Sequence, residues 1–353
     1  MFSARRATAR RSALALGCGT LAFLVGQLAL GLAVERWLPA ARDPEYASKV
    51  ARLRGRCAEA PGRPLVLVLG SSRVQLGLRA GSLDSGPDER PALVFNFGLG
   101  GCASLMEAVC LRRLLHEGVR PDLLVLEVLP ATLNQCGARP VEEEWLDANR
   151  LRSGEAAFLA RYQSDPRRSA CQWLKGRGLP CVWHHDNLRS LLALGGGRFQ
   201  PGPEGLDCAT DPRGWVPYAR EDVPPEQRHS LTDYARHVFG STFGDFRLAE
   251  QPARALDDVL ALCRREGIPV ALLLMPEGPA FRAWYTPSMR AGLDAYLHGL
   301  GERWSAPLID ARDWLDSDAF LDEHHLLPRG AAAFTERFRR EALGPLLQTL
   351  PRR

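Results

Sequence analysis

The stretch LVLVLGSSR at residues 65–73 decides the fold, because it joins a short apolar run to a polar turn. The run Leu65–Leu69 has the length and the valine and leucine content of a strand that is buried on both faces. In open parallel sheets, reactive groups gather where strands end and the chain turns into a helix. The stretch therefore predicts a first buried strand whose carboxyl end carries Ser71 and Ser72.

Four further apolar runs alternate with helical patterns. The runs are Ala92–Phe97, Leu123–Leu129, Pro269–Leu274 and Pro307–Ile309, and the helical patterns are Ser104–Glu117, Ala253–Glu266, Met289–Trp304 and Ala331–Leu347. This alternation predicts a three-layer α/β fold with a five-stranded parallel sheet and right-handed crossovers. We expect residues 64–350 to form one α/β domain.

The span from about 135 to 250 interrupts the alternation. It lacks comparable apolar runs and is dense in proline, glycine, charge and aromatic residues. We interpret it as an insertion into the α/β domain. Its aromatic side chains could fill the core of a small subdomain or form a platform that stacks on sugar rings, and their usual burial favours the core. They are Trp145, Tyr162, Trp173, Trp183, Trp215, Tyr218, Phe243 and Phe246.

Residues 1–34 predict a membrane anchor. Ala13–Val34 is a run of 22 residues without charge, and as a helix it would extend about 33 Å, enough to cross the hydrocarbon core. The positive-inside rule keeps the preceding arginines in the cytoplasm and places the rest of the chain outside a bacterial inner membrane. Residues 35–63 would then form a polar stalk. The arginines are Arg5, Arg6, Arg10 and Arg11.

Exported proteins carry other signals that also begin with arginines. A cleaved secretory signal usually has an apolar region of only about 7–15 residues, shorter than the run here. Lipidation of Cys18 would not require the apolar run to continue beyond that cysteine, and the surroundings of Arg10-Arg11 match a twin-arginine signal weakly. We therefore interpret the segment as an uncleaved anchor, with a cleaved signal as the alternative.

Charge limits the classes of partner. The net charge is +4, and the four N-terminal arginines account for all of it. The remainder is therefore neutral and lacks the basic surface that neutralises phosphates, so nucleic acid is excluded as a partner.

Eight cysteines follow the anchor. In an oxidising compartment, Cys171 with Cys181 and Cys136 with Cys208 are plausible disulfides, although connectivity cannot be derived from sequence. None of the cysteines shows CxxC spacing, so a structural zinc site has little support. The alternative for cysteines with apolar neighbours is a reduced core residue, and this applies to Cys102, Cys110 and Cys263.

A second polar motif, Asp322-Glu-His324-His325, directly precedes the last helical pattern. A carboxylate three residues before an imidazole can fix its tautomer and stabilise the imidazolium that forms during catalysis. With a serine, such a pair makes a catalytic triad. The alternative for both motifs is structural, because serine and aspartate at such places often cap helices.

Together the two motifs resemble the SGNH, or GDSL-type, hydrolase family, whose first block follows the first strand and whose Asp-x-x-His block precedes the last helix. Gly70-Ser71-Ser72 stands where the family has Gly-Asp-Ser. The resemblance implies a flavodoxin-like three-layer sandwich with Ser72, Asp322 and His325 as the catalytic triad. His324 is the fallback base, because an Asp-x-His pair can serve the serine in related polysaccharide O-acetyltransferases.

The second and third blocks concern the oxyanion hole. Asn96-Phe-Gly98-Leu-Gly100-Gly101 matches the second block and implies that the N–H groups of Ser72 and Gly101 hold the oxyanion. The third block, Gly-x-Asn-Asp in the family, is absent in register, because the chain reads Leu126-Glu-Val-Leu-Pro130 there. Asn134 is the candidate for the missing donor, whose loss can cost roughly 10²–10³ in turnover.

Arg73 and Asn96 complete the expected site as substrate-binding residues. Arg73 could hold an anionic group of the substrate, although a salt bridge with a nearby acid is the favoured interpretation of this residue. No metal and no organic cofactor are expected. The sequence thus predicts a serine esterase or O-acyltransferase that acts on ester-linked acyl groups of cell-envelope glycans. The alternative, motivated by the missing asparagine, is a catalytically silent SGNH-like protein that binds polysaccharide or takes part in envelope assembly.

Overall fold

The structure is a computed structural model that describes residues 2–83, 91–137, 139–192 and 210–350. The chain forms two compact units. The first comprises residues 1–47, 147–160 and 165–199, and the second comprises residues 48–146, 161–164 and 200–353. The span that was expected as one insertion is therefore divided between the two units.

The second unit contains a five-stranded sheet in the order β2-β1-β3-β4-β5, and all its pairs are parallel. This confirms the α/β fold class, and the order is that of flavodoxin-like sheets, in which the direction of winding reverses beside β1. The strands are β1 (Leu65–Gly70), β2 (Leu93–Gly98), β3 (Leu123–Glu127), β4 (Val270–Leu274) and β5 (Leu308–Asp310).

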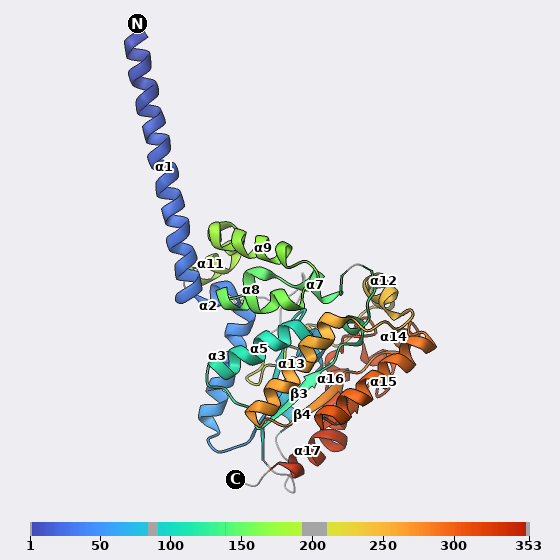
Figure 1. Cartoon of the computed structure of the whole chain (residues 1–353). Helices are drawn as coiled ribbons and strands as arrows, with labels where there is room; N and C mark the ends of the chain where they lie inside the picture. Colours follow the sequence, from blue (N-terminus) through green and yellow to red (C-terminus); the bar gives the residue numbers. More distant parts are fainter. Residues whose placement is uncertain (1, 84–90, 138, 193–209, 351–353) are drawn as a thin grey trace. The chain divides into compact units, whose positions relative to one another are not determined.

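Helices cover both faces of the sheet. Helices α5 and α13 pack side by side on one face, and α16 packs with α4 on the other (Figure 1). The helices of this unit are α3 (Pro44–Glu59, which begins in the first unit), α4 (Ser72–Gly77), α5 (Ser104–His116), α6 (Pro130–Leu133), α7 (Glu142–Trp145), α12 (Pro225–Phe239), α13 (Glu250–Glu266), α14 (Pro279–Arg282), α15 (Pro287–Trp304), α16 (Pro328–Phe338) and α17 (Gly344–Thr349). The last helical pattern is not continuous, because a π-helical turn at Arg339–Leu343 separates α16 from α17.

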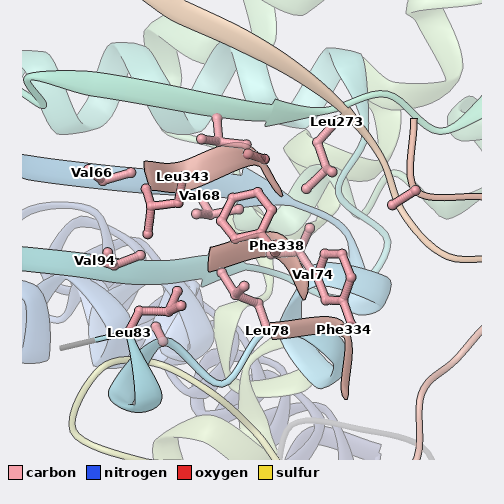
Figure 2. Packing of buried hydrophobic residues seen from close by; sticks show 14 of the residues in the cluster. Val66, Val68, Val74, Leu78, Leu83, Val94, Leu273, Phe334, Phe338 and Leu343 are labelled. Atoms are coloured by element: carbon pink, nitrogen blue, oxygen red, sulfur yellow. The ribbon is translucent and has the colours of Figure 1, made fainter. Parts of the chain in front are cut away.

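The main core lies between one face of the sheet and the C-terminal helices. Alternate side chains of β1, such as Val66 and Val68, point to this face, as Figure 2 shows, and meet Phe334 and Phe338 of α16. All four are fully buried. The strands are mostly apolar because helices bury both faces of the sheet, which is the usual composition of a parallel sheet; the polar exceptions include Asn96 in β2 and Glu127 in β3.

The first unit is built on the long N-terminal helix. Its helices are α1 (Phe2–Arg36), α2 (Pro39–Arg42), α8 (Ser153–Leu159), α9 (Pro166–Gly178), α10 (Pro180–Trp183) and α11 (His185–Leu192). The part Arg10–Arg36 of α1 is long and apolar enough to cross a membrane. Its leucines are largely exposed, as lipid-facing side chains would be.

The cysteines differ from the disulfide expectation. Cys171 lies on exposed surface of α9 and Cys181 on α10, and both are free thiols; Cys136 is also free. Its expected partner, Cys208, lies outside the described residues. Cys102, Cys110 and Cys263 are buried free thiols, as expected of core residues.

Gly98 at the end of β2 provides a test of the packing around the first strand. A Cβ atom there would collide with the amide nitrogen of Gln75 and lie 2.8 Å from the carbonyl oxygen of Ser71. We expect Gly98→Ala to lower the free energy of unfolding by about 1–3 kcal/mol, the usual cost of overpacking. The matched control is Gly55→Ala on exposed surface of α3, where a Cβ meets nothing, and this change should stabilise the protein by up to about 1 kcal/mol. Urea titration of both variants measures the difference, and equal effects would contradict the packing.

Candidate active site

The two serines after β1 have different partners. Ser71 is the N-cap of α4, and its side-chain oxygen accepts a hydrogen bond from the amide of Arg73 at 3.1 Å. Ser72 is the first residue of α4, and its Oγ lies 2.8 Å from Nε2 of His325. The capping role that was the alternative for Ser72 therefore belongs to its neighbour. Ser72 is partly exposed while Ser71 is buried, so the hydroxyl beside His325 is the one that solvent can reach.

Asp322 holds His325 by two hydrogen bonds. Its Oδ2 lies 2.8 Å from the ring Nδ1, and its Oδ1 accepts the backbone N–H of His325 at 2.8 Å. A carboxylate at Nδ1 favours the tautomer with the proton on Nδ1, which leaves Nε2 free to accept the hydroxyl proton of Ser72. The structure thus brings together all three residues that the sequence singled out, in an uninterrupted hydrogen-bonded chain.

A tight loop fixes the position of the imidazole. The amide of Leu321 donates to the carbonyl of His325 at 2.8 Å. Glu323 has a φ of 69°, a left-handed conformation that costs a residue with a side chain free energy unless contacts hold it. Two contacts do so, because its carbonyl accepts from the amide of Gly278 at 2.8 Å and its carboxylate from the amide of Ala280 at 3.0 Å. The loop is therefore tied to the segment after β4.

Asp322 remains ionised. Burial alone would raise its pKa, but the two neighbouring imidazoles and the hydrogen bonds from His325 outweigh burial and hold the pKa well below its usual range. An ionised carboxylate is what the imidazole needs, since it stabilises the imidazolium without taking up a proton itself.

His324, the fallback base, has a structural environment. Its ring is stacked on Phe281 with centroids 5.4 Å apart and meets the ring of Phe239 edge-on at 5.2 Å. Its Nδ1 lies 3.2 Å from Oδ1 of Asp322. Burial lowers the pKa of His324 to about 3 despite the nearby carboxylate, so the ring is neutral at ordinary pH. Among the described contacts, the imidazole that is hydrogen-bonded to Ser72 is that of His325 and not that of His324.

Arg73 forms a buried ion pair and is not open to substrate, so the substrate-binding expectation is wrong. Its side chain is only 2% exposed and donates to the carbonyls of Met275 at 3.0 Å and Pro276 at 2.9 Å. Its guanidinium also lies 3.4 Å from Oε1 of Glu277 and 3.9 Å from Oε1 of Glu127. The salt-bridge alternative is the one observed, because a buried guanidinium needs paired charge and acceptors.

Asn96 is likewise structural, contrary to expectation. It is fully buried, and its amide donates to the carbonyls of Val74 and Leu78, each at 2.8 Å. Its side-chain oxygen accepts from the amide of Gly98 at 2.9 Å. The side chain therefore joins β2 to α4 and has no free group for a ligand.

The oxyanion candidates are placed differently from one another. Gly101 follows β2 with a φ of 65°, a conformation suited to glycine, in the turn at the same carboxyl edge as Ser72. Asn134 is 2% exposed, and its amide donates to the carbonyl of Thr242 at 2.6 Å while its oxygen accepts from the amide of Arg247 at 2.6 Å. These bonds tie the chain after β3 to the segment before α13, so the expected donor role of Asn134 has no support.

The role of Glu127 was not predicted from the sequence. This buried residue ends β3, and its Oε2 accepts the amide of Ser71 at 2.6 Å. Burial raises its pKa, and Arg73 and the amide of Ser71 oppose that rise. The signal was a carboxylate at the end of an apolar strand, at the edge where β1 also ends. Glu277, which also lies on Arg73, accepts the hydroxyl of Tyr285 at 2.8 Å.

Asp322, His324 and His325 are also the group of described residues whose ligand atoms could surround a metal ion, since these atoms lie within 4.8 Å of one another. The 2.8 Å contact between Asp322 and His325, together with the 2.8 Å contact onward to Ser72, is hydrogen-bond geometry. The arrangement therefore suits proton transfer without a metal.

Comparisons with known proteins leave the site to be judged on its geometry. A family model matches residues 247–346, and its description names no activity. No curated protein matches the chain. A crystal structure described as "a putative acylhydrolase" from Bacteroides fragilis NCTC 9343 is 14% identical, with a TM-score of 0.36, over 84% of this chain and 97% of its own. A likeness at that TM-score carries no argument.

Glu127 should matter to stability more than a surface glutamate. Glu127→Ala leaves the buried guanidinium of Arg73 and the amide of Ser71 without this partner, and we expect a loss of about 3–5 kcal/mol in the free energy of unfolding. The control is Glu59→Ala, which removes an exposed pair with Arg56 and should cost no more than about 1 kcal/mol. Chemical denaturation compares the two, and similar losses would count against the buried network.

His324 should make stability depend on pH. Its pKa is about 3 in the folded protein and about 6.5 in an unfolded chain. Between these values the unfolded chain binds the extra proton, so the free energy of unfolding should fall as pH is lowered from about 6.5 toward 4. His324→Gln should flatten this slope, as denaturation curves at several pH values would show. His229→Gln, at an exposed histidine of α12, is the control, and an unchanged slope in His324→Gln would refute the assignment.

Proposed function

We propose that the protein is a serine-dependent esterase or O-acyltransferase with Ser72 as nucleophile, His325 as general base and acid, and Asp322 as the orienting carboxylate. The observation that carries the proposal is the pair of 2.8 Å contacts that connects hydroxyl, imidazole and carboxylate. A serine hydroxyl is a weak nucleophile until an adjacent base accepts its proton. A helix cap or a loop contact alone does not require this complete relay.

The geometry supports a two-step acyl transfer. Oγ of Ser72 attacks the carbonyl carbon of an ester, and its proton passes to Nε2 of His325. The C–O bond to the alcohol then breaks, and His325 returns the proton to the departing oxygen, which leaves an acyl group on Ser72. Water or a second hydroxyl group, deprotonated by His325, attacks this acyl group and restores Ser72. The acceptor decides between hydrolysis and transfer.

Backbone amides are the proposed oxyanion donors. The N–H of Ser71 already donates to Glu127, so the amides of Ser72 and Gly101 are the candidates. Ser72 opens α4, and the first N–H groups of a helix lack partners within the helix. Such preorganised donors lower the barrier because they meet negative charge as it develops on the carbonyl oxygen.

The proposed location and substrate rest on α1. We propose that α1 anchors the chain in a bacterial inner membrane with the rest of the protein outside, because four arginines precede its apolar run. An enzyme in this place meets the glycans of the cell envelope, and ester-linked acyl groups on these glycans are the proposed substrates.

One observation favours a second function. Asn134 is tied to the backbone of Thr242 and Arg247, so its side-chain amide does not stand in for the missing third block. A protein with this fold and a weak oxyanion hole would serve as a binding or assembly protein for envelope polysaccharide. Covalent labelling by a serine-directed fluorophosphonate separates the two functions, since a silent protein would not react.

Ser72→Ala should abolish both fluorophosphonate labelling and hydrolysis of a chromogenic acetyl ester, because no other hydroxyl is in contact with His325 among the described residues. Ser71→Ala is the matched control: it removes a helix cap worth about 1 kcal/mol and should retain labelling. Mass spectrometry of the labelled peptide locates the adduct. Unchanged turnover in Ser72→Ala, or no labelling of the natural protein, would end the enzymatic proposal. Release of acetate from an O-acetylated glycan then tests the substrate class.

A further inference from the structure

Helices α9 and α10 pack against the C-terminal part of α1, all within the first unit (Figure 1). The side-chain oxygen of Gln27 accepts the amide of Cys181 at 3.3 Å. Gly31 lies close to the backbone of α9, since a Cβ atom there would lie 2.8 Å from the carbonyl oxygen of Arg177. Glu35 forms an ion pair with the guanidinium of Arg177. Three successive turns of α1 therefore hold the helix pair.

The contacts of Gln27 and Gly31 lie within the apolar run of α1. Gly31 is five residues before Arg36, so it stands about 8 Å along the axis from the end of the helix, and Gln27 stands about 14 Å from it. Amphipathic helices at a membrane surface bury their apolar face about 5–10 Å into the boundary between headgroups and acyl chains. When α1 crosses a bilayer, α10 consequently reaches the depth of that boundary.

Several large apolar side chains of the helix pair are exposed. Val182 is 60% exposed, Trp183 44% and Leu174 59%, and Leu179 between the two helices is also exposed. Trp37, directly after α1, is 69% exposed. Tryptophan collects at the interface between membrane and water, where its ring is partly in the acyl region and its N–H remains hydrated.

Charge distinguishes a lipid surface from other occupants. Helix α9 carries Arg167, Arg168 and Lys175 on exposed positions, and it has no acidic residue. Basic side chains beside exposed apolar and aromatic ones are the composition of helices that lie in an anionic membrane surface. A neutral glycan would give no reason for this charge.

We propose that α9 and α10 form a membrane-interface collar, which rests in the headgroup layer at the C-terminal end of α1 with Val182 and Trp183 in contact with acyl chains. The proposal rests on the proposed crossing of the membrane by α1. It also accounts for Gln27, a polar residue in the apolar run of α1. Gln27 is only 7% exposed. The backbone of α10 satisfies the side-chain oxygen of Gln27, as buried polar groups at membrane depth require.

Tryptophan fluorescence of the full chain tests the collar. The protein is reconstituted into vesicles of phosphatidylethanolamine and phosphatidylglycerol, with either ordinary or brominated acyl chains. The emission of Trp183 is the difference between the natural protein and Trp183→Phe, a conservative change at an exposed position. Trp37→Phe reports in the same way on the end of the anchor. Trp304→Phe is the control, because that indole is partly buried and donates to Asp257 at 2.8 Å in the second unit.

The collar predicts that brominated lipids quench the emission of Trp183, that aqueous iodide does not, and that the emission of Trp304 is the same in both kinds of vesicle. Quenching of Trp37 without quenching of Trp183 would overturn the collar and leave the anchor intact. Quenching of neither would overturn both. Protection of Trp183 from iodide without quenching by bromine would point to a protein occupant and would also overturn the collar. The esterase proposal is judged separately, by the Ser72→Ala experiment.

Discussion

The arrangement of the candidate site depends on one buried cation. The positively charged guanidinium of Arg73 is only 2% exposed. Such a charge needs acceptors inside the protein, and it finds them in the carbonyls of Met275 and Pro276 and in the carboxylate of Glu277, with the carboxylate of Glu127 3.9 Å away. These groups come from the ends of β3 and β4, while Arg73 follows β1. A buried ion network of this kind contributes little net stability, but it determines which strand ends lie together.

The site builds on this arrangement in two steps. The carboxylate of Glu127 accepts a hydrogen bond from the amide of Ser71, and Ser71 caps α4. Both contacts hold the turn that carries Ser72. On the opposite side, Glu323 ties the histidine loop to Gly278 and Ala280, directly after Glu277. Ser72 and His325 are therefore both anchored to groups that surround Arg73. Their 2.8 Å contact results from that common support.

Sequence alone predicted what depends on local pattern. The aliphatic run Leu65–Leu69 is visible because both faces of a parallel strand are buried, and Asp322 and His325 stand out because their spacing lets them bond to each other. The structural role of Asn96 was missed, and that of Arg73 was left open between substrate and salt bridge, for the opposite reason. A polar side chain near a site is equally consistent with ligand binding and with burial, and only the packing of other segments decides between them.

The same limit applies farther along the chain. Asn134 was predicted from its distance along the sequence, whereas its bonds to Thr242 and Arg247 depend on where the segment before α13 returns. The π-helical turn at Arg339–Leu343 leaves the apolar pattern of the last helix unchanged, so periodicity could not reveal it. The division of residues 135–250 between two units results from contacts with α1 and α2. The composition of that span does not predict these contacts.

The contacts of α1 have a practical consequence for handling this protein. Deleting the first 34 residues would be the ordinary route to a water-soluble version, but it would remove Gln27 and Gly31 from beneath α10. The amide of Cys181 would lose its acceptor, and the apolar surface of the helix pair would grow where it already exposes Val182 and Trp183. Aggregation of the shortened protein would then result from this exposed apolar surface, and it would say nothing about the fold of the second unit.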